Sequence, residues 1–451
     1  MSVMKKASPI SAAELSGFEE DYHSKRYYSA MTHAMSKISV ADAAFCQENA
    51  YRMRRVYSID IPTLPVANQL SSGRCWLFAA LNVMREIIGR RYNLERFELS
   101  QNYIAFWDKF EKINYYLESI IDTAYRDADD RTVSWIVSTG IQDGGQWDMM
   151  AALVRKYGLV SKDAMPETYQ SSHTGAMNSM INTKLRGYAA SLRGMIRSGA
   201  SDGDVRAEKQ RILNEMYRIL CACFGEPPKT FDFECKNQDT LEYTVIRGLT
   251  PHEFYDKYIG GILDDYVSII NAPTADKPFG RTYTVKYLGN VVEGEPVHYL
   301  NLEMDELVSL VVKQLRNKEL VWFGSDVSKF GDRAAGVWDD RSYDYGAAFD
   351  IDYSISKADA LDYRDSSMNH AMVITGVNLD ENGRPTRWKI ENSWGDKNGD
   401  EGYYMMSDTW FERFVYQAVI NKKYLSAEQL RMLEQPVIEL NPWDPMGSLA
   451  D

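Results

Sequence analysis

The stretch Asn68-Gln-Leu-Ser-Ser-Gly-Arg-Cys-Trp-Leu-Phe-Ala79 decides the fold, because it places a cysteine directly ahead of a strongly helical pattern. Apolar residues then recur at the spacing of one helix face: Trp76, Ala79, Ala80, Val83, Met84, Ile87 and Ile88. Ser71, Ser72 and Gly73 are plausible helix starts, which would put Cys75 in the first turn. The partial positive charge at a helix amino end favours a thiolate. The stretch therefore predicts a nucleophilic cysteine at the start of a helix.

A thiolate nucleophile needs a partner that carries its proton, and histidine commonly fills that role. Of the six histidines, only His370 opens a clear strand pattern with a second polar residue in register. Two alternating runs, 370–377 and 387–392, flank the turn residues 380–385, so they predict a hairpin. The side-chain oxygen of Asn392 could accept a ring N–H of His370 and fix its tautomer. Trp394 could cover that hydrogen bond and keep water away.

Acyl transfer also needs hydrogen-bond donors for the oxyanion of the tetrahedral intermediate. Gln69 lies six residues before Cys75 and can supply a side-chain amide N–H, while the backbone N–H of Cys75 can supply a second. Taken singly these signals are weak, because a lone cysteine more often behaves as a small core hydrophobe. Taken together they predict a Cys–His site for acyl transfer.

Helical patterns come first along the chain and strand patterns second, which predicts an α+β fold with segregated halves. We expect residues 1–60 to form an amino-terminal arm. Residues 61–250 are expected to form a helical half that carries the nucleophile and also has a helical insertion. Residues 251–435 are expected to form a β-rich half that carries His370 and Asn392. Residues 436–451 should form a carboxyl-terminal arm, extended because its prolines and glycine disfavour a helix.

The amino-acid composition indicates in which compartment the protein works and which partners are disfavoured. Five cysteines are an odd and sparse set, which fits a reducing compartment such as the cytoplasm rather than a disulfide framework. The first nine residues hold two lysines with no apolar stretch after them, so no secretory signal is expected. No apolar run approaches the roughly 18–20 residues of a membrane span. A formal net charge of −13 repels phosphate backbones and disfavours nucleic-acid binding.

Two patterns that mimic metal sites are set aside. Cys221 and Cys223 lie two apart in a helical pattern, so they point to different faces, and no second pair has the spacing of a zinc site. The segment 396–402 begins like a calcium loop but has Glu401 where that loop requires glycine. We therefore expect no metal and no cofactor beyond a reduced thiol.

Three segments resemble the signature segments of papain-like cysteine peptidases: 68–79, Asn369-His-Ala-Met372 and Glu391-Asn-Ser-Trp-Gly395. Further segments resemble those of the bleomycin hydrolase and aminopeptidase C family: 99–103, 106–112, 143–149, 402–411 and 442–447. The matching segments spread over most of the chain. The resemblance implies a papain-like two-part fold, with the active-site cleft between a helical half and a β-rich half.

By matching position, the resemblance implies a role for each candidate residue of the site. Cys75 would be the nucleophile, His370 the acid and base, Asn392 the orienting group and Gln69 the oxyanion donor. Gly144 and Gly145 resemble the glycine pair that offers backbone hydrogen bonds to an extended substrate.

The resemblance also bears on the assembly and on the tail. It implies an intracellular aminopeptidase that assembles as a homohexamer. The arm 436–451 would enter the cleft, lose Asp451 by self-processing and present the carboxylate of Ala450 to the ammonium group of a substrate.

The expected function is therefore that of a cysteine aminopeptidase, which hydrolyses amino-terminal residues from peptides through a thioester acyl-enzyme. Two enzyme alternatives stay open: an acyl transferase with an amine acceptor in place of water, and an endopeptidase with the same site. A binding protein with a vestigial site is disfavoured, because Gln69, Cys75, His370 and Asn392 are all intact.

Overall fold

The structure is a computed structural model that describes residues 8–450. These residues form two compact units, which separate after Arg54 and at the segment Asp339–Ser354. Residues 1–7, which include the two lysines considered for a secretory signal, and Asp451 lie outside the described residues.

The smaller unit joins the residues before Arg55 to Asp339–Ser354. The backbone N–H of Cys46 donates to the carbonyl of Ser342 at 2.8 Å, and Lys25 forms an ion pair with Asp350 at 3.2 Å. The predicted arm 1–60 is therefore tied to a segment of the predicted β-rich half. The elements of this unit are α1 (Ala12–Ser24), α2 (Arg26–Met35), α3 (Val40–Ala44), α4 (Gln47–Ala50), the 3-10 helix η2 (Asp340–Ser342) and α14 (Tyr345–Phe349).

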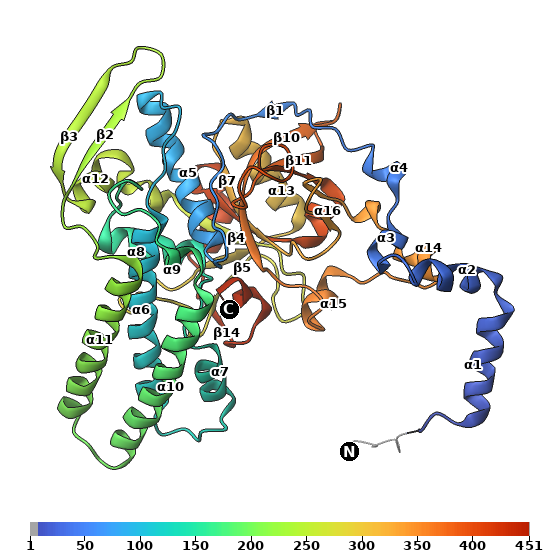
Figure 1. Ribbon diagram of the computed structural model, residues 1–451, viewed down its shortest axis with the longest axis horizontal. Coiled ribbons are helices and arrows are strands. Elements are labelled where there is room, and N and C mark those ends of the chain that lie inside the picture. Colours follow the sequence, from blue (N-terminus) through green and yellow to red (C-terminus); the bar gives the residue numbers. More distant parts are fainter. Residues whose placement is uncertain (1–7, 451) are drawn as a thin grey trace. The chain divides into compact units, whose positions relative to one another are not determined.

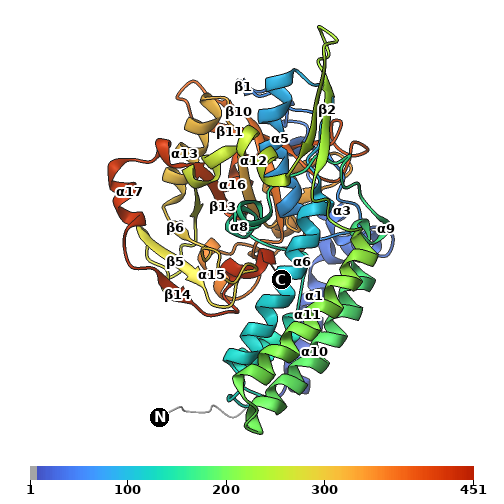
Figure 2. The ribbon, with the colours of Figure 1, turned by 90° about the vertical axis from the view of Figure 1, so that its left-hand side faces the viewer.

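The larger unit begins with helices, as the sequence predicted. The central one is α5, which runs from Cys75 to Tyr92 and is buried on nearly every side, including its polar residues Asn82, Arg85 and Glu86. The others are α6 (Gln101–Asp122), α7 (Arg131–Thr139), α8 (Trp147–Tyr157), α9 (Tyr169–Ser172), α10 (Gly175–Arg197) and α11 (Asp202–Phe224). The long helices α6, α10 and α11 lie side by side (Figures 1 and 2) and correspond to the predicted helical insertion.

A 12-stranded mixed sheet forms the second part of the larger unit. Its strand order is β14-β5-β6-β4-β13-β7-β10-β11-β12-β9-β8, and β1 pairs with β10. The strands are β1 (Ile59–Asp60), β4 (Tyr266–Ile270), β5 (Arg281–Val285), β6 (Tyr299–Asn301), β7 (Val321–Ser325), β8 (Gly331–Asp332), β9 (Val337–Trp338), β10 (His370–Leu379), β11 (Pro385–Glu391), β12 (Tyr403–Ser407), β13 (Val415–Asn421) and β14 (Ile438–Leu440). The predicted hairpin is β10–β11, in which Val373 faces Glu391.

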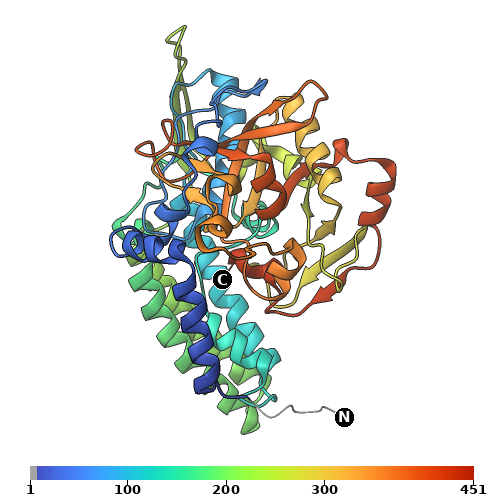
Figure 3. The same cartoon turned by 90° about the vertical axis from the view of Figure 1, so that its right-hand side faces the viewer.

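Further helices accompany the strands, so the β-rich half is mixed: α12 (Pro251–Tyr258), η1 (Gly260–Asp265), α13 (Met304–Arg316), α15 (Lys357–Asp362), α16 (Asp408–Phe414), η3 (Lys422–Tyr424) and α17 (Ala427–Leu433). Figure 3 shows the long green helices running away from the orange and red strands of the sheet. The α+β fold expected from the sequence is confirmed.

Two local expectations were wrong. The helical half contains a two-stranded hairpin, β2 (Phe231–Lys236) with β3 (Tyr243–Leu249), on which Phe233 faces inward while its neighbours are exposed. The tail is not extended to its end, because residues Pro445–Ala450 form the 3-10 helix η4. Prolines fit that helix, since its first residues need no backbone donor. No helix among residues 8–450 is long and apolar enough to cross a membrane.

Candidate active site

Cys75 is the first residue of α5, as predicted, but the predicted cap residues do not cap the helix. The N-cap position is Arg74, which makes no capping hydrogen bond. Its buried guanidinium donates to both carboxylate oxygens of Glu167, at 3.1 and 2.9 Å, and to the hydroxyl of Ser72 at 3.0 Å. These bonds hold the side chain of Arg74 in place directly before Cys75, and they account for an arginine at this position.

The imidazole of His370 is held by the residue that the sequence predicted. Its Nε2 lies 2.9 Å from Oδ1 of Asn392, and both side chains are buried. The ring of Trp394 lies over the imidazole, with 4.7 Å between ring centres and 32° between planes. Because Nε2 is bound to Asn392, Nδ1 is the ring nitrogen left for the thiol.

The thiol lies against the start of the strand that His370 opens. The backbone N–H of Ala371, the residue after His370, donates to Sγ of Cys75 at 3.4 Å. Burial raises the pKa of the Cys75 thiol to about 11 and lowers the pKa of His370 to about 4. Burial thus works against a lone charge on either group, so a thiolate here needs the imidazolium beside it.

A buried charge pair joins the nucleophile helix to the strand that ends beside Asn392. The carboxylate of Glu391 accepts from the guanidinium of Arg85 at 2.9 Å and from the amide of Asn82 at 2.8 Å. Arg85 and Asn82 lie on α5, and Glu391 is the last residue of β11. The relative position of Cys75 and Asn392 is therefore fixed by polar contacts as well as by packing.

Gln69 lies in the loop that leads to Cys75, residues 68–74, and both the oxygen and the nitrogen of its side-chain amide are hydrogen-bonded. Oε1 accepts from the hydroxyl of Ser393 at 2.5 Å, and Nε2 donates to the carbonyl of Ser72 at 2.6 Å. An amide nitrogen has two N–H groups, so one remains for an oxyanion. The sequence analysis missed Ser393, although it directly follows Asn392.

Asp143 is a second residue that the sequence analysis did not single out. Its carboxylate accepts from the backbone N–H of Gly73 at 2.9 Å, from Lys109 at 2.6 Å and from Asn178 at 2.8 Å. Although burial alone would raise the pKa of Asp143, the charge of Lys109 and these hydrogen bonds hold it well below its usual value. Asp143 therefore stays ionised and anchors the loop that leads to Cys75.

The comparisons with known proteins agree with this geometry. The model of the Peptidase C1-like family matches residues 9–447 of the chain. This chain belongs to the Peptidase C1-like family. It is 45% identical to Aminopeptidase C of Lactobacillus helveticus over 98% of this chain and 99% of the relative. Its identity to Aminopeptidase C of Listeria innocua is 48%, over 88% of each chain. The crystal structure of PepW from Lactobacillus rhamnosis matches with a TM-score of 0.95 and 48% identity, over 98% of this chain and 99% of that one.

In this member of the Peptidase C1-like family the two predicted glycines have different surroundings. A Cβ on Gly144 would lie 2.2 Å from the carbonyl oxygen of Leu449, so the tail packs directly on its backbone. A Cβ on Gly145 would lie 2.6 Å from the ring of Trp76. The carbonyl of Gly144 accepts from the ammonium of Lys112. Both positions thus require glycine for close packing.

The tail of this peptidase is packed against the larger unit from Pro442 to Ala450. Trp443 lies under the guanidinium of Arg131, 3.8 Å from the ring centre, and Asp444 forms an ion pair with Lys277 at 3.0 Å. Met446 is fully buried, and Ser448 donates to the carbonyl of Met368 at 2.7 Å. The tail therefore ends, at Ala450, in the neighbourhood of the Cys75 loop.

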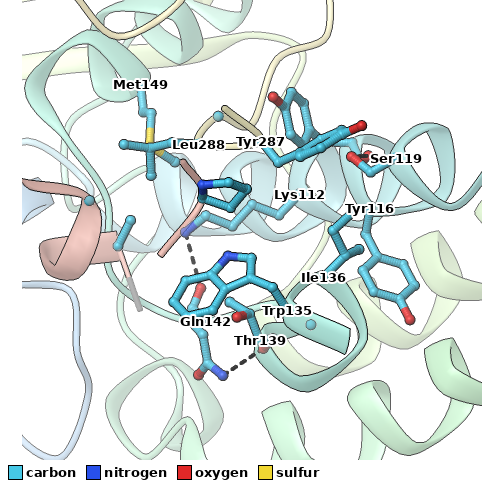
Figure 4. A pocket seen from close by; sticks show the side chains of 16 residues that line it. Lys112, Tyr116, Ser119, Trp135, Ile136, Thr139, Gln142, Met149, Tyr287 and Leu288 are labelled. Carbon is cyan, nitrogen blue, oxygen red and sulfur yellow. Dashed lines mark hydrogen bonds between the residues drawn. The ribbon is translucent and has the colours of Figure 1, made fainter. Parts of the chain in front are cut away.

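A cavity opens beside the end of the tail (Figure 4). Its walls are mostly aromatic and apolar, and Gly447 and Ala450 of the tail close one side. The cation in the lining, Lys112, is tied to Asp108 at 2.8 Å and to the carbonyl of Gln142 at 3.0 Å. The lining residues drawn from α6, α7 and the 287–289 loop include Tyr115, Tyr116, Trp135, Ile136 and Leu288.

Proposed function

We propose that this chain is a cysteine aminopeptidase, which hydrolyses amino-terminal residues from peptides through a thioester. The observation that carries the proposal is the thiol of Cys75 against the strand that His370 opens, together with an imidazole whose Nε2 is held by Asn392. The amino-terminal direction is supported by a packed tail that ends at the Cys75 loop. It is also supported by the names of the relatives.

The reaction follows from which atoms can carry the proton. Nδ1 of His370 takes the proton of the Cys75 thiol, and the thiolate attacks the carbonyl carbon of the first peptide bond. The oxyanion is bound by the side-chain N–H of Gln69 and the backbone N–H of Cys75. The imidazolium then protonates the leaving amine, and water hydrolyses the thioester with His370 as base.

The tail supplies the block that an aminopeptidase needs. A cleft open at both ends would cut inside chains, whereas one closed beyond the first residue admits only a free amino end. We assign that role to Ser448, Leu449 and Ala450, because Leu449 and Ala450 cover the backbone of Gly144. A terminal carboxylate on Ala450, left after removal of Asp451, would pair with the ammonium of the substrate.

Truncation of the tail tests this proposal. The intact protein should remove single residues from a free-amine peptide and leave its acetylated twin untouched, with products identified by mass. A variant that ends at Met446 keeps the Trp443 and Asp444 anchors, and it should lose most aminopeptidase activity and begin to cut acetylated or internal bonds. Removal of Asp451 alone is the matched control and should change nothing. A truncated enzyme that still refused acetylated peptides would show that the tail does not set the direction.

Substitution of Gln69 tests the oxyanion site. Gln69→Ala should lower kcat by about a hundredfold to a thousandfold, because one oxyanion donor is lost. Ser393→Ala removes only the bond to Oε1, so it should cost far less while leaving the amide in place. Equal losses in the two variants, or a loss in Gln69→Ala that appears only in KM, would contradict the assigned role.

An acyl transferase with the same site is the second enzyme candidate, and product analysis with and without an added amine acceptor separates the two. We also propose a cytoplasmic location and a homohexameric assembly. The sparse cysteines support the first, and the family resemblance supports the second.

A further inference from the structure

Trp394 contacts a cation as well as the imidazole. The guanidinium carbon of Arg333 lies 4.5 Å from its ring centre, and the centre of the His370 ring lies 4.7 Å away. Added together, these distances place the guanidinium at most about 9 Å from the imidazole. Arg333 lies between β8 and β9, and it has no part in the mechanism described above.

The guanidinium of Arg333 is exposed and has no acidic partner. Within residues 8–450 no carboxylate comes within ion-pair distance of it. The neighbouring carboxylate of Asp332 accepts from the backbone N–H of Ala335 at 2.9 Å instead. The backbone carbonyl of Arg333 accepts from the hydroxyl of Tyr404 at 3.2 Å, which holds the segment in place. The guanidinium of Arg333 is thus held over the ring of Trp394, with no carboxylate of residues 8–450 to compete with an anion from outside.

The place of this cation relative to a substrate follows from the proposed function, on which this step rests. His370 must protonate the leaving amine, so the fragment behind that amine lies on the His370 side of Cys75. The other side is covered by the tail, which packs against Gly144. Arg333, at most about 9 Å from that imidazole, is within reach of the leaving fragment.

We propose that Arg333 binds the free α-carboxylate of the leaving fragment when the substrate is a dipeptide or tripeptide. A guanidinium donates two parallel hydrogen bonds to a carboxylate, which gives both affinity and orientation. One extended residue spans at most about 3.6 Å, so the reach from the imidazole to Arg333 covers the first two or three residues. A longer substrate would carry its carboxylate past this cation. The chain should accordingly favour short peptides.

The test compares leucyl-glycine and leucyl-glycyl-glycine with their carboxyl-terminal amides and with a leucyl coumarin amide, which has no carboxylate. Arg333→Gln should lower kcat/KM about tenfold for the two free acids, mainly through KM. It should change the amides and the coumarin substrate by less than about twofold. Arg333→Lys should recover part of the loss, since it keeps the charge. Arg384→Gln, which removes an equally exposed cation from the 380–385 turn, is the matched control and should change no substrate.

Two results would overturn the inference. An equal loss on acids and amides would mean that Arg333 acts only through Trp394 and His370, and no loss on any substrate would mean that it binds nothing. Failure of the unaltered protein on the leucyl coumarin amide would instead contradict the proposed function itself, so the two failures are distinguishable.

Discussion

Replacement of Cys75 by alanine is expected to abolish peptide hydrolysis, with a fall in kcat on the order of a millionfold. The thiol of Cys75 lies against the strand that His370 opens, so it is the group placed to form the thioester. Turnover of a leucyl coumarin amide measures the loss. Activity within about a hundredfold of the unaltered protein would contradict the assignment of the nucleophile.

The control for this variant is its melting temperature, which reports whether the fold is intact. Cys75 is buried, and the substitution removes a single heavy atom from a well-packed site, so the melting temperature should stay within a few degrees. In the unaltered protein, iodoacetamide should modify Cys75 before the other four cysteines, which peptide mapping can follow. Modification of Cys46 or Cys235 with Cys75 untouched would be inconsistent with a thiolate at this position.

Replacement of His370 by alanine is expected to lower kcat by about a hundredfold to ten-thousandfold, because the proton carrier is lost. The variant should also change the pH dependence of the alkylation of Cys75. Burial raises the pKa of the thiol to about 11 although backbone N–H groups lower it, and the variant has no imidazolium to stabilise the thiolate further. Alkylation of Cys75 in the variant should therefore be slow at neutral pH and rise only at alkaline pH. The unaltered protein should react at neutral pH.

Asn392→Ala provides the comparison for this prediction. It removes the acceptor of the Nε2 proton but leaves the imidazole, so it should cost less than His370→Ala and keep the alkylation at neutral pH. If Asn392→Ala proved as damaging with the fold intact, the division between proton carrier and orienting group would be wrong. A neutral-pH alkylation rate unchanged in His370→Ala would equally contradict the ion pair.

The sequence predicted those parts of the site that depend on residues close together in the chain. The β10–β11 hairpin follows from alternation around a turn cluster, so the amino-acid sequence alone is enough to place His370 at the start of one strand and Asn392 just past the end of the other. Asp143 could not be found in that way, because it holds Gly73 from 70 residues away and only the fold brings them together.

The conformation of the tail and the position of Arg333 were not predicted. Proline and glycine suggested an extended arm, but the burial of Met446 and Leu449 favours the compact turns of η4. An exposed arginine in a short loop belongs to no sequence pattern that would predict a binding site. Its interest comes only from the ring of Trp394 on which it lies.

The charge pair between Arg85 and Glu391 has a consequence for how substrates come and go. If the two halves of the larger unit moved apart, the contacts of Glu391 with Arg85 and Asn82 would be lost together. Arg85 would keep a carboxylate partner on its own helix, Glu86 at 3.7 Å, whereas Glu391 would have to exchange its partners for water. Closing the halves therefore satisfies Glu391, and we expect peptides to enter a groove whose two walls are held together at its floor.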